Sequence, residues 1–351
     1  MTYRVVQWAT GGLGKAAIQG IADHPELELV GCWVHSENKV GLDAGEIAGR
    51  EPLGVCASHD VDAILALEAD CVLYSPILGQ AEQVARILES GKNVVTPLGW
   101  FYPVRSPEVA GLEASCRKGG VTLHGTGIHP GGITERFPLM VSALSRAITH
   151  VRAEEFSDIR SYGAPEVISN IMLFGKTREE AARSPMLAIL GGGFQQSIDM
   201  VAAALGFALD ADRGSQHEMA VATAPIDSPI GTIPAGRVAA QRFTWQGLVR
   251  GEAVITVRTN WLMGVDHLDP PWDFGAEGER FEVEITGDPS VQVSFHGLHP
   301  PSVEAGLARN PGIVATAQHC VNAIPYVCAA EPGIRSYLDL PLVAGRAARG
   351  P

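Results

Sequence analysis

The sequence predicts an α/β protein with a doubly wound parallel sheet and a second α+β domain that carries a mostly antiparallel sheet. Short apolar segments alternate with helical ones in the first third of the chain, as expected of strands covered by helices on both faces of a parallel sheet. Longer alternating segments cluster over residues 238–295, which favours an antiparallel sheet. At 351 residues, the chain also exceeds one typical domain of roughly 100–200 residues.

The first domain is expected over residues 1–128 together with 303–351. Pro107 in a first turn and Gly119 after a last turn mark one of its helices. The apolar helix 313–329 is expected to return to this domain. The expected strands are 3–8, 27–35, 71–74, 93–96 and 121–124, and the other expected helices are 15–23, 60–67 and 80–90.

The second domain is expected over residues 129–302. Apolar and polar residues alternate along its strands, as they do where one face of a sheet is buried. The expected strands are 148–156, 238–249, 252–261, 281–286 and 291–295, and the expected helices are 165–174, 178–183 and 194–205.

The composition limits the partners. Lys and Arg number 26 against 39 Asp and Glu, a formal net charge of −13, whereas proteins that bind phosphate backbones carry basic patches. We therefore expect no nucleic-acid partner and no membrane partner. The N-terminus lacks the apolar core of a signal peptide, so a cytoplasmic location is expected. The six cysteines form no Cys-x-x-Cys pair, and most are expected to be buried thiols.

A glycine-rich turn follows the first expected strand and opens the first expected helix. Gly11, Gly14 and Ala17 form the pattern Gly-x-x-Gly-x-x-Ala. Glycines at a strand–helix turn let the backbone approach a pyrophosphate, and the helix amides then point at the anion. In this context the turn predicts a dinucleotide site. The expected contact residues are Thr10, Gly11, Gly12, Leu13 and Gly14.

The end of the second strand bears on the choice of dinucleotide. Enzymes that prefer NAD usually carry an acidic residue there for the ribose hydroxyls, and this strand ends in His35 and Ser36. These residues and Lys39 favour a 2′-phosphate, hence NADP, with NAD as the alternative. Further along, ligands of open α/β sheets bind at the carboxyl ends of strands. The backbones at Ser75, Pro76 and Thr96 are therefore expected near the nicotinamide, unless the prolines simply end the strands.

Several segments together resemble one family. They are the glycine turn, the loop 35–46, the segment 92–97 and the glycine-rich segment 125–132. With these segments the chain resembles the dihydrodipicolinate-reductase-like proteins that include 2,4-diaminopentanoate dehydrogenase and the native amine dehydrogenases. The resemblance is clearest over residues 1–140 and 313–335.

The resemblance implies a Rossmann domain, a smaller α+β domain, a homodimer and hydride transfer between a nicotinamide and a C=N carbon. It also implies that a small amine, ketone or imine substrate lies between the domains. The family's amine dehydrogenases carry a catalytic carboxylate after the fifth strand, shortly before Tyr-Pro. Here the matching segment, 98–103, contains none.

Two residues are candidates for the proton transfer instead. Tyr102 could polarise a carbonyl or imine, although it could equally serve as an aromatic lid. His129 has a reference pKa of about 6.5, which suits acid–base work near neutrality, although a lone His is more often structural. No metal site is expected, since hydride transfer from a nicotinamide requires none. The residues expected to line the substrate pocket are Trp100, Phe101, Asp158, Tyr162, Asn170 and Phe174.

Three functions remain open from the sequence. The first is an NAD(P)H-dependent oxidoreductase acting on a C=N group. The second is a carbonyl or alcohol oxidoreductase on the same scaffold. The third is a dinucleotide-binding sensor without turnover, which the missing carboxylate would favour.

Overall fold

The structure is a computed structural model that describes residues 2–184 and 186–347. These residues form two compact units. Unit 1 combines the first 131 residues with those from 313 onward, and unit 2 comprises residues 132–312. No helix in the described part of the chain has both the length and the apolarity needed to cross a lipid bilayer.

Unit 1 is built on a seven-stranded parallel sheet with the strand order β16-β6-β5-β4-β1-β2-β3. Apart from the added β16, this is the doubly wound order of dinucleotide-binding domains, which confirms the expected fold. The strands are β1 (Tyr3–Trp8), β2 (Leu27–Trp33), β3 (Ala57–Ser58), β4 (Cys71–Tyr74), β5 (Asn93–Thr96), β6 (Thr122–Gly125) and β16 (Gly333–Ile334). The helices are α1 (Gly12–Asp23), α2 (Ala44–Ile47), α3 (Val61–Leu65), α4 (Ala81–Glu89), α5 (Val109–Gly119) and α11 (Pro311–Cys328).

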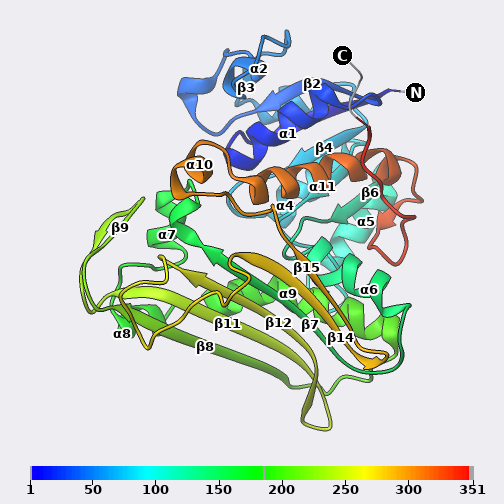
Figure 1. The fold of residues 1–351 in the computed structure, drawn as a ribbon. Helices are drawn as coiled ribbons and strands as arrows, with labels where there is room; N and C mark the ends of the chain where they lie inside the picture. The colour runs from blue at the N-terminus through cyan, green and yellow to red at the C-terminus, as the bar shows by residue number, and fades with distance from the viewer. Residues whose placement is uncertain (1, 185, 348–351) are drawn as a thin grey trace. The chain divides into compact units, whose positions relative to one another are not determined.

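Both faces of this sheet are buried. Neighbouring residues on one strand point to opposite faces, so Val5 packs with α1 and α11 while Val6 packs with α4 and α5. Helix α11 lies beside α1 (Figure 1), with Ile313 against Gly12. The continuous apolar strands follow from this double covering.

Unit 2 is built on a second seven-stranded sheet, in the order β13-β8-β11-β12-β7-β14-β15. All pairs are antiparallel except β12 with β7, so the expected mostly antiparallel sheet is confirmed (Figure 1). The strands are β7 (Arg146–Asp158), β8 (Arg213–Ala222), β9 (Ile226–Ser228), β10 (Gly231–Ile233), β11 (Val238–Val249), β12 (Glu252–Leu262), β13 (Leu268–Asp269), β14 (Arg280–Asp288) and β15 (Val291–Phe295). The helices are α6 (Phe137–Ser142), α7 (Pro165–Asn170), α8 (Arg178–Ala182), α9 (Met186–Leu205) and α10 (Val303–Ala308).

The two faces of this second sheet differ in chemistry. Helix α9 covers the apolar face, where Phe194 stacks on Trp245 at 4.6 Å between ring centroids. The opposite face carries ion pairs, in which Arg152 binds Glu282 at 2.9 Å and Glu284 at 2.6 Å. We call this second surface the charged face. Its other members are Glu154, Glu218, Arg242, Arg258 and Arg280.

The structure adds elements that the sequence pattern did not predict. The largest is β8, whose first residues are mostly polar and partly exposed, so they show no apolar alternation. The β9–β10 hairpin was likewise not expected. Helix α9 also begins eight residues earlier than the expected start at 194.

Candidate active site

The glycine turn after β1 is held in a strained shape. Ala9 has a φ of 77°, a left-handed conformation that costs a non-glycine residue about 1–3 kcal/mol. The buried Gln7 amide donates to the Ala9 carbonyl at 2.8 Å and to the Ser75 hydroxyl at 2.9 Å. A Cβ on Gly14 would lie 2.1 Å from that same Ala9 carbonyl oxygen. Glycine at position 14 is therefore required for the turn to close.

The first turn of α1 is prepared for an anion. Its N-cap residue, Gly11, makes no side-chain cap, and the first turn contains no acidic residue. The backbone amides at the start of a helix then remain available to a ligand. A Cβ built on Gly11 meets no atom within 4 Å. The turn that Thr10, Gly12 and Leu13 complete thus fits the diphosphate of a dinucleotide.

A cation lies at this turn. The Lys39 ammonium donates to both the carbonyl and the hydroxyl oxygen of Thr10, at 3.1 Å each. His35 and Ser36 are exposed beside it, and the Ser36 hydroxyl caps nothing in the short 3-10 turn that it precedes. The three residues expected to read a 2′-phosphate therefore lie in one short segment after β2.

The carboxyl ends of β4 and β5 are tied to the same edge of the sheet. The Ser75 hydroxyl donates to the Trp8 carbonyl at 3.2 Å, which links the end of β4 to β1, and Pro76 follows half-buried. Thr96 is fully buried, and its hydroxyl accepts from the Leu98 amide at 3.2 Å. The predicted contacts of these residues with a nicotinamide stay predictions.

The loop after β5 packs tightly on β6. Trp100 has a φ of 56°, a strained value for a bulky residue. A Cβ on Gly125 would lie 2.2 Å from the Gly99 carbonyl oxygen, so the loop fits only against glycine. Trp100 and Phe101 are buried, whereas Tyr102 is half-buried. Of these three side chains, Tyr102 is therefore the most accessible to a ligand.

A polar cluster at the end of β6 has no counterpart in the sequence-based predictions. The Thr126 hydroxyl lies 3.1 Å from His319 Nδ1 and within hydrogen-bond distance of the Tyr337 hydroxyl, which is itself 3.0 Å from His319 Nδ1. The three residues are far apart in the chain, so no local motif could reveal them. His129, three residues beyond Thr126, is half-buried.

In unit 2 the expected substrate residues have different environments. Asp158 binds Arg160 through both carboxylate oxygens, at 3.0 Å to Nε from each and 2.6 Å to Nη2. Tyr162 packs against the apolar core, and burial followed by the charge of Glu155 raises its pKa. Asn170 is exposed at the end of α7. Asp158 and Tyr162 therefore have defined contacts within unit 2, whereas Asn170 lies at the surface.

The fourth of the expected substrate residues in unit 2, Phe174, is only 1% exposed and lines a pocket of about 450 Å³. Glu166, Lys176 and the β9–β10 hairpin line the same pocket. Its walls therefore combine apolar side chains with charges of both signs.

Two carboxyls in unit 2, one fully buried and one half-buried, were not predicted as catalytic. Glu135 is fully buried, accepts from the Ser197 hydroxyl at 2.6 Å, and has its pKa raised by burial to about 8. Glu155 accepts from the Ser157 hydroxyl at 2.6 Å, and burial raises its pKa to about 7. Carboxyls tuned toward neutrality are typical of acid–base sites.

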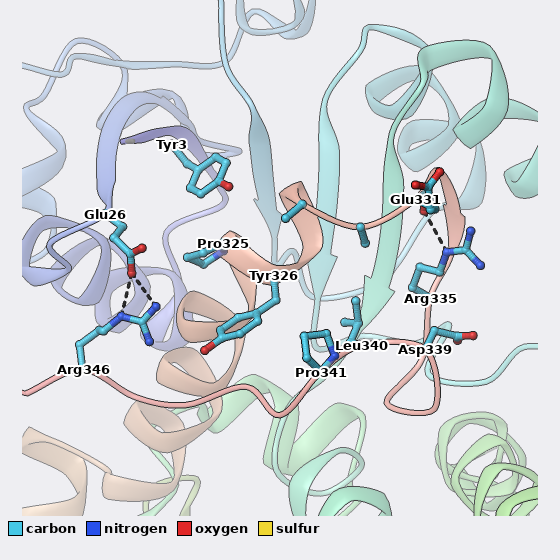
Figure 2. A pocket seen from close by; sticks show the side chains of 12 residues that line it. Tyr3, Glu26, Pro325, Tyr326, Glu331, Arg335, Asp339, Leu340, Pro341 and Arg346 are labelled. Carbon is cyan, nitrogen blue, oxygen red and sulfur yellow. Dashed lines mark hydrogen bonds and ion pairs between the residues drawn. The ribbon is translucent and has the colours of Figure 1, made fainter.

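A larger pocket lies elsewhere in unit 1. Figure 2 shows it beside the C-terminal segment, where Arg346 pairs with Glu26 at 2.6 Å and Arg335 donates to the Glu331 carbonyl at 2.9 Å. Its volume is about 610 Å³, and Tyr3, at the start of β1, lines it. It therefore lies at the amino ends of the strands, away from the glycine turn. Within the described residues no group of three or more His, Cys, Asp or Glu side chains is arranged to hold a metal ion.

The strand order and the glycine turn define the class of the protein: one with a Rossmann-type dinucleotide-binding domain. Residues 5–96 match the family model of the dihydrodipicolinate reductase N-terminus, and residues 133–349 match that of the 2,4-diaminopentanoate dehydrogenase C-terminal domain. The chain belongs to this family of 2,4-diaminopentanoate dehydrogenase-like proteins, which confirms the resemblance seen in the sequence.

Individual relatives agree with this membership. An amine dehydrogenase of Streptomyces virginiae is 32% identical over 96% of both chains. The 2,4-diaminopentanoate dehydrogenase of Acetoanaerobium sticklandii is 27% identical over 84% of this chain and 79% of its own. The solved amine dehydrogenase of Mycobacterium smegmatis superimposes with a TM-score of 0.80 at 23% identity, over 99% of this chain and 98% of that one, which shows a shared fold.

Replacing Gly11 should separate coenzyme binding from folding. Because the position has open space and an ordinary φ of −70°, Gly11→Val should leave the melting temperature nearly unchanged. Its side chain would occupy the space of the diphosphate, so we expect dinucleotide affinity to fall roughly tenfold or more, about 1.4 kcal/mol. Fluorescence titration with NADPH and NADH measures this.

The matched control is Gly111→Ala, at an exposed helix position that also has open space around it. It should bind both coenzymes normally. Unchanged affinity in Gly11→Val would show that the turn does not hold the diphosphate.

Proposed function

We propose that this chain is an NAD(P)-dependent amine dehydrogenase that interconverts a small primary amine and the corresponding ketone or aldehyde plus ammonia. The observation that carries the proposal is the relationship to the Streptomyces virginiae amine dehydrogenase, which extends over 96% of both chains. The uncapped, open glycine turn supports it, because the reaction needs a bound dinucleotide. When bound, the nicotinamide supplies a hydride acceptor or donor.

The site residues are assigned by the same proposal. The backbone from Thr10 to Gly14 binds the diphosphate, and the backbones at Ser75, Pro76 and Thr96 face the nicotinamide. Tyr102 and His129 are the unit 1 candidates for a group that polarises the substrate nitrogen or oxygen. The residues proposed to contact the substrate are Trp100, Phe101, Asp158, Tyr162, Asn170 and Phe174.

A carbonyl or alcohol oxidoreductase is the second candidate, because the segment 98–103 contains no carboxylate. Ammonia separates the two functions. A panel of small ketones and aldehydes with NADPH or NADH should give oxidation of the coenzyme only when ammonium is added, measured as loss of absorbance of the reduced form. Equal rates without ammonium would favour the second candidate. Tight coenzyme binding without turnover on any substrate would favour a sensor.

We propose NADP as the preferred coenzyme. Lys39 places a cation on the glycine turn, and Ser36 offers an exposed hydroxyl close by in the sequence. A 2′-phosphate accepts charge-assisted hydrogen bonds from such groups, each worth about 1.5–3 kcal/mol. NAD has a hydroxyl at that position and gains less from the same contacts.

Replacing both Ser36 and Lys39 by Ala should therefore weaken NADP at least about tenfold more than NAD, as measured by the ratio of the two dissociation constants. The ratio is the readout because Lys39 also holds Thr10, so its loss affects the turn that both coenzymes share. Lys15→Ala removes an exposed cation from α1, the helix that follows the glycine turn, and should leave the ratio unchanged. Equal losses for both coenzymes in the double variant would reject the assignment.

We also propose that the chain forms a homodimer through the charged face of unit 2. This face carries both arginines and glutamates, so that the same surface on a second copy offers complementary charges. Two members of the charged face, Arg280 and Glu282, are largely buried within the single chain, at 9% and 4% exposure. Arginine is also enriched at protein interfaces.

Glu218→Lys should then shift the protein toward monomer in sedimentation-velocity experiments at micromolar concentration. Glu218 is half exposed and lies 3.7 Å from Arg242, so lysine places like charges together at the face. The control Glu166→Lys changes the net charge equally at an exposed position on α7 and should remain a dimer. A monomeric wild-type protein would disprove the dimer. If the Glu218→Lys variant remained a dimer, the interface would lie on another surface.

A further inference from the structure

Strand β7 places a carboxylate on the side of its sheet where a structural acid is not expected. Val151 packs in the apolar core of unit 2, and Ala153 is buried beside Val257 of that core. Strand residues two apart share a face. Glu155 and Ser157 therefore continue the apolar face. Carboxylates are almost never placed on such a face unless they are bound or functional.

Glu154, the residue before Glu155 on β7, is a structural carboxylate and serves as a comparison. Glu154 faces the charged side, where Arg152 and Arg258 pair with it and the Asn260 amide donates to it at 2.9 Å. The groups that set the pKa of Glu155 are of another kind: a hydroxyl, an indole and a second carboxyl.

The surroundings of Glu155 form a defined polar group within the apolar face. Ser157 Oγ lies 2.6 Å from Glu155 Oε1 and 2.8 Å from His299 Nε2, so the hydroxyl links the carboxyl to the imidazole. Across the sheet, Thr259 of β12 and Phe281 of β14 oppose Glu155 directly.

Two further groups, the indole of Trp261 and the carboxyl of Glu279, act on the Glu155 carboxyl. Burial raises the pKa of Glu155 to about 7, Ser157 and the indole of Trp261 lower it, and the charge of Glu279 raises it. Burial also raises the pKa of Glu279 to about 7 and lowers that of His299 to about 4. His299 is therefore neutral at pH 7, while Glu155 exchanges its proton there.

Glu155 differs from Glu135, the other carboxyl with a raised pKa described above, in its accessibility to a ligand. Glu135 is fully enclosed, so a ligand does not reach its oxygens. Glu155 is only half-buried, and the half-buried Tyr162, a predicted substrate residue, faces it from the segment that follows β7.

We propose that Glu155 is the general base of the reaction, the group that accepts the proton from the substrate ammonium. Ser157 and His299 are positioning residues that orient its carboxylate. The assignment rests on the amine dehydrogenase function proposed above. The segment 98–103 contains no carboxylate. In this proposal Glu155, on strand β7 of unit 2, is the carboxylate that acts instead.

The proton and electron balance is simple. The Glu155 carboxylate takes one proton from the ammonium group of the substrate and becomes a carboxylic acid, which leaves a neutral primary amine. The bond between the amine-bearing carbon and its hydrogen then breaks, with its electron pair passing to the oxidised coenzyme, and the nitrogen lone pair forms the C=N bond of an iminium cation. Glu155 returns its proton to solvent, and as a carboxylate it next deprotonates the water that attacks this iminium.

The pH profile of amine oxidation tests the assignment. In the wild-type protein kcat/KM should rise as the pH passes about 7, because the carboxylate form is the base. Glu155→Gln should remove this limb and lower kcat about 100-fold or more, the usual contribution of a general base. Its remaining activity should rise only at about pH 10, where an alkylammonium loses its own proton, by analogy with lysine.

Two matched variants should move the same limb in opposite directions without removing it. Glu279→Gln takes away a charge that raises the pKa of Glu155, so the limb should shift to lower pH. Ser157→Ala takes away a hydrogen bond that lowers this pKa, so the limb should shift to higher pH. These shifts keep the proposal testable even if Glu155→Gln folds poorly.

A readout without coenzyme comes from infrared spectroscopy. The carboxylic acid band that is lost in Glu155→Gln should titrate at about pH 7 in the wild-type protein. Absence of such a band in mildly acidic solution would overturn the proposal, as would a wild-type pH limb that survives in Glu155→Gln and disappears in His129→Ala. If the wild-type protein oxidises no amine, the proposed function fails and the role of Glu155 fails with it. Turnover with an unchanged profile in Glu155→Gln rejects Glu155 alone.

Discussion

The close approach between the Ala9 carbonyl and Gly14 is the constraint on which unit 1 depends. It turns the chain from β1 into α1 so sharply that no Cβ fits at position 14, where it would lie 2.1 Å from the carbonyl oxygen. Ala9 must adopt a left-handed conformation that costs about 1–3 kcal/mol. Two hydrogen bonds from the buried Gln7 amide, each worth about 1 kcal/mol net, offset much of that cost and tie the turn to Ser75 at the end of β4. Gly11, the N-cap residue of α1, has no side chain, so no side chain caps the amides of the first helical turn.

Much of unit 1 is predictable because its signals are local. The glycine turn, the prolines and the short apolar strands each act within a few residues, and β4 and β5 match their expected bounds. Strand β8 escapes prediction because its exposed residues carry no apolar alternation. The cluster of Thr126, His319 and Tyr337 escapes it because the fold joins the end of β6 to segments about two hundred residues later, and no spacing rule encodes such a contact.

The site proposed in unit 2 shows a different limit of sequence reasoning. The segment Ala-Glu-Glu-Phe-Ser-Asp over 153–158 contains adjacent glutamates, and strand periodicity requires them to point to opposite faces. The pattern does not say which one faces the core, because the usual rule that charged residues face solvent applies to both. Pairing of β7 with β12 and β14 decides it. Asp158 and Tyr162, by contrast, could be singled out as polar residues at a strand end.

The same alternation explains how one strand supplies two carboxylates of different character. Glu154 lies among arginines, so its charge is neutralised where it helps to hold β7, β12 and β14 together. Glu155 is the next residue but lies on the apolar face, where burial works against its charge and leaves it able to exchange a proton near neutrality. Pairs of like groups pushed apart by their environments are a recurring solution for acid–base chemistry. A strand fixes such a group more rigidly than a loop does, and the loop after β5 is then free to pack Trp100 and Phe101 against Gly125. The absence of a carboxylate from the segment 98–103 is therefore compatible with the proposed role of Glu155 as the base.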